Sequence, residues 1–278
     1  MEALEQHGHR HGEGIDLRWV FAAGEEEPQK LRQIVADAVR QNRPNVIVTA
    51  STPLTEAARA ASQDIPIVMT ISGSPVQTGL LASVRRPGSN VTGSTSKSHE
   101  LSRKQLEALR ERVRGLDQVA IIWNPHNPAK KLEFEVALRA GRALRIKIAN
   151  ETAAPNLARR LEVTGDEADF ADAFRAARES GAKGVIVFGD PVTVRNREAI
   201  AAAGREGPPA IYESSDFVEA GGLMSYGPDR RQLYRQAARL VARVLKGEQP
   251  ARIAVPPARF ELTINEPLSA EMRSKGLL

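Results

Sequence analysis

Residues 216–229 read DFVEAGGLMSYGPD, and the rest of the chain is best understood outward from this stretch. A short polar helical turn at 216–220 leads into Gly221 and Gly222, which permit a backbone path closed to residues with a Cβ. A short strand is expected at 223–226, and Gly227-Pro228 then separates it from a long amphipathic helix. Such a crowded, polar connection is typical of a functional loop. An ordinary connection between a helix and a strand accounts for the same residues.

Four other segments share one design, an apolar strand that ends in a polar or proline-marked turn. They read VIVTASTP (46–53), IPIVMTISGSP (65–75), VAIIWNPHNP (119–128) and GVIVFGDP (184–191). Helical periodicity lies between and after them, as in 28–41, 54–62, 101–113 and 232–246. Strands that alternate with such helices predict parallel sheets with covered faces. The fold class is therefore α/β, and 278 residues are enough for two such units.

The remaining elements are predicted less directly. Alternating residues indicate a strand at 15–20, and a short helix is expected around 79–84. Strands are expected at 210–212 and 260–264, and a terminal helix at 267–275.

Composition excludes several classes of protein. No apolar run approaches the roughly 18 residues of a membrane-spanning helix, and the segment MEALEQHGHRHGEG has no apolar core like that of a secretory signal. There are no cysteines, so disulfides and thiolate metal sites are excluded. The net charge is +5, but the arginines are spread along helices and aromatic residues make up 4%. A concentrated basic patch with stacking residues is missing, so we expect no nucleic-acid partner.

The stretch at 216–229 closely resembles the signature of a family of ABC-transporter solute-binding proteins, the type I periplasmic class. The likeness continues through most of the chain in order, in NRPNVIVTASTPLTEAARAA (42–61), IPIVMTISGSPVQTGLLASVRRPGSNVTG (65–93), VAIIWNPHNP (119–128), GVIVFGDP (184–191) and PPAIYESSDFVEAGG (208–222). Characterised members of this family bind aromatic amino acids.

The resemblance implies two Rossmann-like lobes with parallel sheets, joined by a hinge. Lobe one is expected at 1–95 with 228–278, and lobe two at 96–227, with crossovers near 93–96 and 226–228. Hinge closure would capture an amino acid or small carboxylate, perhaps aromatic, in the inter-lobe cleft for delivery to ABC permease subunits. The implied protein is a monomer without a cofactor, in the periplasm or at the cell surface, although the sequence as given lacks a signal peptide.

Two departures from the family pattern stand out. The chain opens inside the helix that should follow the first strand of lobe one, so that strand is apparently missing. Residues 148–160 look like an insertion in a surface loop of lobe two. A missing segment and a re-pairing of the strands are the two explanations for the first departure, and we favour the missing segment.

Polar residues follow the strands of both lobes, where open parallel sheets bind ligands. We expect a ligand to be held by eleven of them: Ser51, Thr52, Thr70, Ser72, Ser74, Asn124, Asn127, Asp190, Tyr212, Ser214 and Asp216. Ser51 or Thr52 can cap the next helix, with or without a ligand carboxylate at its N-terminus. Relatives typically carry an acidic residue at the position of Ser74, which leaves Asp190 as the candidate for a cationic group. Trp123 is expected in the core.

Other functions find less support. His7, His9 and His11 alternate and invite a metal hypothesis, but they replace non-ligand residues of the family, so we expect no metal. No nucleophile elbow, phosphate-binding loop or zinc-protease motif is present, and we expect no enzyme activity. An intracellular ligand sensor of the same fold, or an α/β enzyme that uses Asp190, are the alternatives.

Overall fold

The computed structural model describes residues 2–20, 28–97, 101–163 and 167–278. By its internal contacts the chain divides into two compact units, each made of two segments. Unit 1 comprises Met1–Lys97 and Arg230–Arg259, and unit 2 comprises Ser98–Asp229 and Phe260–Leu278. The chain therefore passes between the units three times, after Lys97, Asp229 and Arg259.

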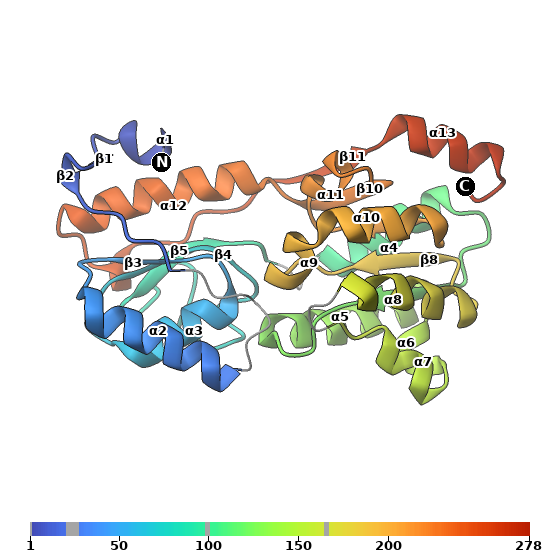
Figure 1. Cartoon of the computed structure of the whole chain (residues 1–278), viewed down its shortest axis with the longest axis horizontal. Helices are drawn as coiled ribbons and strands as arrows, with labels where there is room; N and C mark the ends of the chain where they lie inside the picture. Colours follow the sequence, from blue (N-terminus) through green and yellow to red (C-terminus); the bar gives the residue numbers. More distant parts are fainter. Residues whose placement is uncertain (1, 21–27, 98–100, 164–166) are drawn as a thin grey trace. The chain divides into compact units, whose positions relative to one another are not determined.

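Unit 1 is built on a parallel sheet with strand order β3-β4-β5 (Figure 1). Its strands are β3 (Ile47–Thr49), β4 (Ile67–Ser72) and β5 (Val91–Thr95). Side chains of β4 alternate between two cores: Ile67 and Met69 pack in the one that includes Ala58 of α3 (Thr52–Ala61), and Val68 packs against α12 (Arg230–Leu245). Helix α2 (Pro28–Asn42) lies with α3, and α1 (Glu2–Glu5) lies against α12. Helices thus cover both faces of the sheet.

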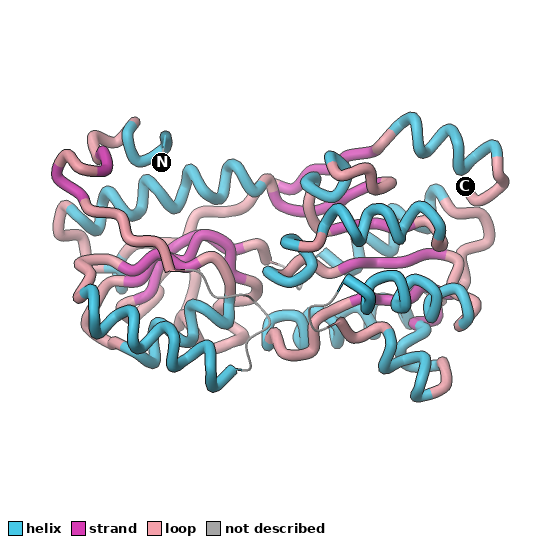
Figure 2. The backbone as a smooth tube through the Cα atoms, viewed as in Figure 1, coloured by secondary structure: helices cyan, strands magenta, loops and turns pink. Residues whose placement is uncertain are grey.

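Unit 2 has a six-stranded sheet with order β11-β10-β9-β8-β6-β7, in which the pair β10–β11 is antiparallel and the others are parallel. Its strands are β6 (Gln118–Ile122), β7 (Lys147–Ile148), β8 (Gly184–Val187), β9 (Ala210–Tyr212), β10 (Met224–Pro228) and β11 (Phe260–Ile264). Figure 2 shows these strands in magenta with helices in cyan around them.

Two cores hold the helices of unit 2 against its sheet. One core packs α4 (Leu101–Arg112), α5 (Pro128–Leu144) and α13 (Glu266–Ser274) against residues such as Ile121 and Ile186. The other packs α8 (Glu167–Glu179), α10 (Arg197–Glu206) and α11 (Ser215–Glu219) against neighbours such as Ile122 and Val187. The predicted α/β class with parallel-dominated sheets is confirmed.

The end of the chain differs from the predicted division. We expected all of 228–278 in lobe one, but the contacts group Phe260–Leu278 with unit 2. The reason is strand pairing: β11 pairs antiparallel with β10, and Met272 of α13 packs in a core of unit 2.

Three local predictions also need correction. The strand expected at 15–20 is reduced to β2 (Gly14–Ile15), which pairs with β1 (Arg10–His11), and Trp19 beyond it is 70% exposed. The helix expected near 79–84 is a turn, since Leu80 N and Leu81 N both donate to the carbonyl of Pro75.

Most of the segment 148–160 is helical and not a plain loop. They form α6 (Ala149–Thr152) and α7 (Pro155–Arg160). Asn150 fixes this segment to the sheet, because its side chain accepts from Ile121 N (2.9 Å) and donates to Ile121 O (2.8 Å). One amide side chain thereby satisfies two backbone groups of β6.

The glycines of the stretch that opened the sequence analysis behave as predicted. Gly221 has φ +97°, in the region that residues with a Cβ rarely adopt. A Cβ on Gly222 would lie 2.6 Å from the Tyr212 ring and 2.8 Å from Phe217 O. Both positions therefore require glycine.

Candidate functional site

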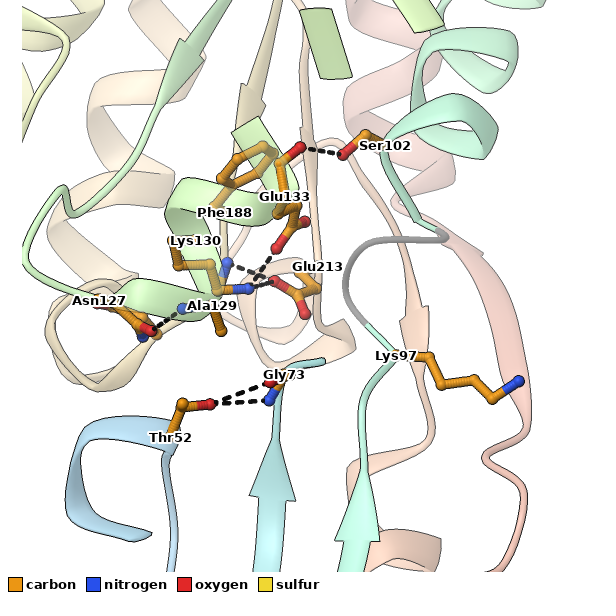
Figure 3. Close-up of polar contacts among 12 residues, drawn as sticks. Thr52, Gly73, Lys97, Ser102, Asn127, Ala129, Lys130, Glu133, Phe188 and Glu213 are labelled. Atoms are coloured by element: carbon orange, nitrogen blue, oxygen red, sulfur yellow. Dashed lines mark hydrogen bonds and ion pairs between the residues drawn. The ribbon is translucent and has the colours of Figure 1, made fainter. Parts of the chain in front are cut away.

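In unit 1, hydroxyl groups join the carboxyl ends of β3 and β4, and Figure 3 shows the contact between Thr52 and Gly73. Thr52 Oγ1 lies 3.0 Å from Ser72 Oγ and accepts a hydrogen bond of 3.1 Å from Gly73 N. Thr70 Oγ1 donates to Thr49 O at 3.0 Å, which ties the two strands together two residues before Ser72. The predicted residues are thus brought together, and Thr52, Thr70 and Ser72 are all buried.

Ser51 begins helix α3, as the sequence predicted for Ser51 or Thr52. Its side chain accepts from Leu54 N at 3.3 Å, so Ser51 is the N-cap, whereas Thr52 turns toward β4. Ser74 lies in the loop after β4 with φ +47°, and its carbonyl accepts from Thr78 N. Unit 1 therefore presents a hydroxyl-rich strand end next to a capped helix N-terminus.

In unit 2, Asp190 connects the ends of β6 and β8. Its Oδ2 accepts from Asn124 Nδ2 at 2.7 Å, and its Oδ1 accepts from Thr193 N at 3.0 Å. Thr193 Oγ1 in turn accepts from Asp190 N at 2.9 Å, which completes a capping box at α9 (Pro191–Arg195). The predicted Asn124 and Asp190 thus contact each other directly, and both are buried.

The other predicted polar residues of unit 2 also lie where strands give way to helices. Asn127 caps α5 by accepting from Ala129 N at 3.1 Å, and Ser214 caps α11 by accepting from Asp216 N at 3.2 Å. Asp216 lies in the first turn of α11 and is half-buried. Four predicted site residues, Ser51, Asn127, Asp190 and Ser214, are therefore helix caps at the carboxyl ends of strands.

Tyr212 is a correction to the predicted set. Its side chain is fully buried in the core of unit 2 and stacks on Phe217 with ring centroids 4.9 Å apart. Burial raises the pKa of the Tyr212 hydroxyl. The ring faces α10 and α11 because neighbouring strand residues point to opposite faces, and Ile211 takes the other one. Trp123 is in the core as expected, stacked on Phe134 at 4.6 Å.

The sequence analysis missed a buried charge cluster formed by Lys130, Glu133 and Glu213 (Figure 3). Lys130 Nζ lies 2.7 Å from Glu133 Oε2 and 2.6 Å from Glu213 Oε2, and all three side chains are at least nine-tenths buried. A signal existed: Lys130 lies in the first turn of α5, where the helix dipole disfavours a cation, so a compensating anion was to be expected.

Asp190 gives a prediction on pH. Burial raises the pKa of its carboxyl above the ordinary value of 3.8, opposed in part by Thr193 N, Asn124 and Lys130. Just above pH 3.8 the folded protein then binds more protons at Asp190 than the unfolded chain does, so the stability that this group contributes falls as the pH rises. Denaturant unfolding of Asp190→Asn and the unchanged protein should show the variant gaining relative stability with rising pH.

A matched control has the opposite sign. The exposed Asp117 accepts from Lys183 at 3.0 Å, and this bond lowers the pKa of the Asp117 carboxyl. The stability from this pair is present above the ordinary pKa and is lost as the pH falls through the lowered value. Asp117→Asn should therefore lose relative stability as the pH rises. Parallel pH curves for Asp190→Asn and the unchanged protein would contradict the burial argument.

His7, His9 and His11 lie in the described N-terminal segment. Across the described part of the chain, no three His, Cys, Asp or Glu side chains gather as a metal site would need. His11 Nδ1 accepts from Leu17 N at 3.1 Å and so shapes the local turn. None of the described helices is long and apolar enough to cross a membrane.

Comparison with known sequences decides the family. The family described as ABC transporter substrate binding protein matches residues 1–272. The chain belongs to this family. The resemblance seen in the sequence is thereby confirmed, and the chain is a substrate-binding protein of the ABC transporter family. A tyrosine-binding protein of Clostridioides difficile is 27% identical in an alignment 283 positions long, which covers 96% of this substrate-binding protein and 73% of the relative.

Solved structures share the fold of this substrate-binding protein. A conserved domain protein from Vibrio cholerae aligns with TM-score 0.82 and 24% identity, covering 98% of this chain and 87% of that one. An ABC domain from Streptococcus pneumonia in complex with L-Trp aligns with TM-score 0.81 and 18% identity at the same coverage. The predicted type I periplasmic binding fold is confirmed.

Proposed function

We propose that this substrate-binding protein captures an aromatic amino acid outside the cytoplasm and delivers it to the permease subunits of an ABC importer. The observation that carries the proposal is the family match over residues 1–272. Buried polar groups at the carboxyl ends of strands, where open parallel sheets bind ligands, support it. A location in the periplasm or at the cell surface, a monomeric state and the absence of a catalytic step follow from the same proposal.

The carboxylate and the ammonium of an amino acid need partners of opposite charge. A ligand carboxylate suits the N-terminus of α3 beside Ser51 and Thr52, because the positive end of the helix dipole favours an anion there. A ligand ammonium suits Asp190, because burial makes its ionised carboxylate costly and a cation would offset that cost. Ser74 cannot supply a negative charge, so unit 1 offers no substitute at that position.

Two further carboxylates at the strand ends of unit 2 are occupied by an ion pair. Glu133 and Glu213 both contact the ammonium of Lys130, at 2.7 and 2.6 Å. Asp190 is attracted by Lys130 as well, but its two oxygens face Asn124 and Thr193. Of the two carboxylates in the predicted set, Asp190 is buried and Asp216 is half-buried, so Asp190 is the one that we assign to the ligand. Capture by hinge closure of the two units, as the family resemblance implies, is part of the proposal.

The test is thermal unfolding against L-tryptophan, L-tyrosine and a panel of other amino acids, small carboxylates, sugars and nucleosides. A ligand that binds the folded state at 100 times its Kd should add about 2.7 kcal/mol of stability. We expect that shift with one or both aromatic amino acids. Cooperative unfolding with no shift for either would contradict the aromatic ligand.

Two analogues of tryptophan separate the proposed contacts. Tryptamine lacks the carboxylate and indole-3-propionate lacks the ammonium, and both keep the indole ring. Because a buried charge left without its partner costs several kcal/mol, both should lose most of the shift. Asp190→Asn should weaken the binding of L-tryptophan strongly and that of indole-3-propionate little. Equal weakening of the binding of both ligands would show that Asp190 does not contact the ammonium.

A further inference from the structure

Glu213, a residue outside the predicted ligand set, connects three elements at the strand ends of unit 2 (Figure 3). It directly follows β9, and its Oε2 accepts from Lys130 Nζ of α5 at 2.6 Å. The same oxygen accepts from Gly189 N at 2.7 Å, in the turn between β8 and α9. Asp190 is the next residue of that turn, so Glu213 holds the backbone that carries the Asp190 carboxylate.

Close packing adds to the hydrogen bond. A Cβ on Gly189 would lie 3.0 Å from Glu213 Oε2 and 3.1 Å from Glu213 Cβ, so the turn lies directly against this side chain. Lys130 in turn fixes the carboxylate, because a buried ammonium between two carboxylates leaves Glu213 little freedom to rotate. The link therefore runs from Lys130 through Glu213 to Gly189 and Asp190.

We propose that Glu213 is a positioning residue for ligand binding, which holds the Gly189–Asp190 turn so that the Asp190 carboxylate meets the ligand ammonium. The proposal rests on the proposed function, in which Asp190 receives that ammonium. Glu213 does not itself touch the ligand. Its contribution is to order the turn before the ligand arrives, which lowers the entropy that binding has to remove.

Glu133 provides a matched control within the same cluster. It is buried and accepts one hydrogen bond from Lys130 but, unlike Glu213, it lies on α5. Removal of either glutamate leaves Lys130 paired with one carboxylate, so Glu213→Ala and Glu133→Ala make the same change in charge and volume. Only Glu213→Ala also takes the acceptor from Gly189 N.

The test measures amide hydrogen exchange at Gly189 and Asp190 without ligand, the affinity for L-tryptophan and L-tyrosine by calorimetry, and unfolding free energies. We expect Glu213→Ala to speed exchange at Gly189 and to weaken binding, each about tenfold, since a hydrogen bond to a charged group is lost. Glu133→Ala, at a similar loss of stability, should leave both quantities within about twofold of the unchanged protein.

The result that would overturn the proposal is equal weakening of binding by the two variants at equal stability, or unchanged exchange at Gly189 in Glu213→Ala. If the unchanged protein binds neither amino acid, the proposed ligand fails, while the exchange arm still decides whether Glu213 holds the turn. If Glu213→Ala does not fold, Glu213→Met against Glu133→Met makes the same comparison, because methionine keeps most of the volume and removes both the charge and the acceptor oxygens.

Discussion

Gly227→Ala is expected to lower the free energy of unfolding by about 3 kcal/mol or more. Gly227 lies in β10 beside the end of β9, where a Cβ would stand 1.6 Å from Glu213 O and 2.6 Å from Glu213 C. The obstacle is backbone, so no side chain can rotate away to make room. The sheet would have to separate at the strand ends that carry Glu213 and Ser214.

Gly247→Ala is the control for that experiment. Gly247 has φ +93° but nothing within 4 Å of its Cβ position, so alanine there destabilises the protein only through the strained backbone conformation and not through a clash. That cost is roughly 1–2 kcal/mol. Denaturant unfolding of both variants should therefore separate the two terms. A loss for Gly227→Ala no larger than that for Gly247→Ala would show that the strands can move apart cheaply.

Gly227 shows which features of the fold can be predicted from the sequence. The sequence predicts that Gly227-Pro228 separates a strand from a helix, whereas both residues lie within β10. Glycine is required at this position because β9 passes close to it. The distance between two strands cannot be predicted from the sequence of either strand alone. Local signals did predict the strands and helices themselves, since apolar runs and helical periodicity depend on neighbouring residues.

The polar strand ends were predictable for the same reason. Ser51, Asn127, Asp190 and Ser214 each stand between a strand and a helix, and capping residues are recognisable in such positions. The face to which Tyr212 points was not predictable, because β9 has three residues and so gives too short an alternation.

The Lys130–Glu213 ion pair joins residues 83 positions apart, and no periodicity links them. The position of β11 has the same origin: its antiparallel pairing with β10 moves the chain end into unit 2, and an isolated strand does not specify its neighbour. Long-range contacts of this kind decide both the missed charge cluster and the corrected domain boundary.

Lys130→Met is expected to lower the free energy of unfolding by about 3–5 kcal/mol near pH 7. Burial alone would lower the pKa of Lys130, and the attraction of Glu133 and Glu213 raises it overall, so the lysine is charged at that pH. Methionine keeps most of the length of the side chain and removes the ammonium. Two buried carboxylates are then left close together without a cation.

Removal of the two carboxylates identifies the cause of this loss. Adding Glu133→Gln and Glu213→Gln to Lys130→Met should recover much of the lost free energy of unfolding at pH 7, because no buried charge remains in the cluster. A loss that is not recovered by the glutamines would mean that the shape of Lys130, rather than its charge, holds α5 to the sheet.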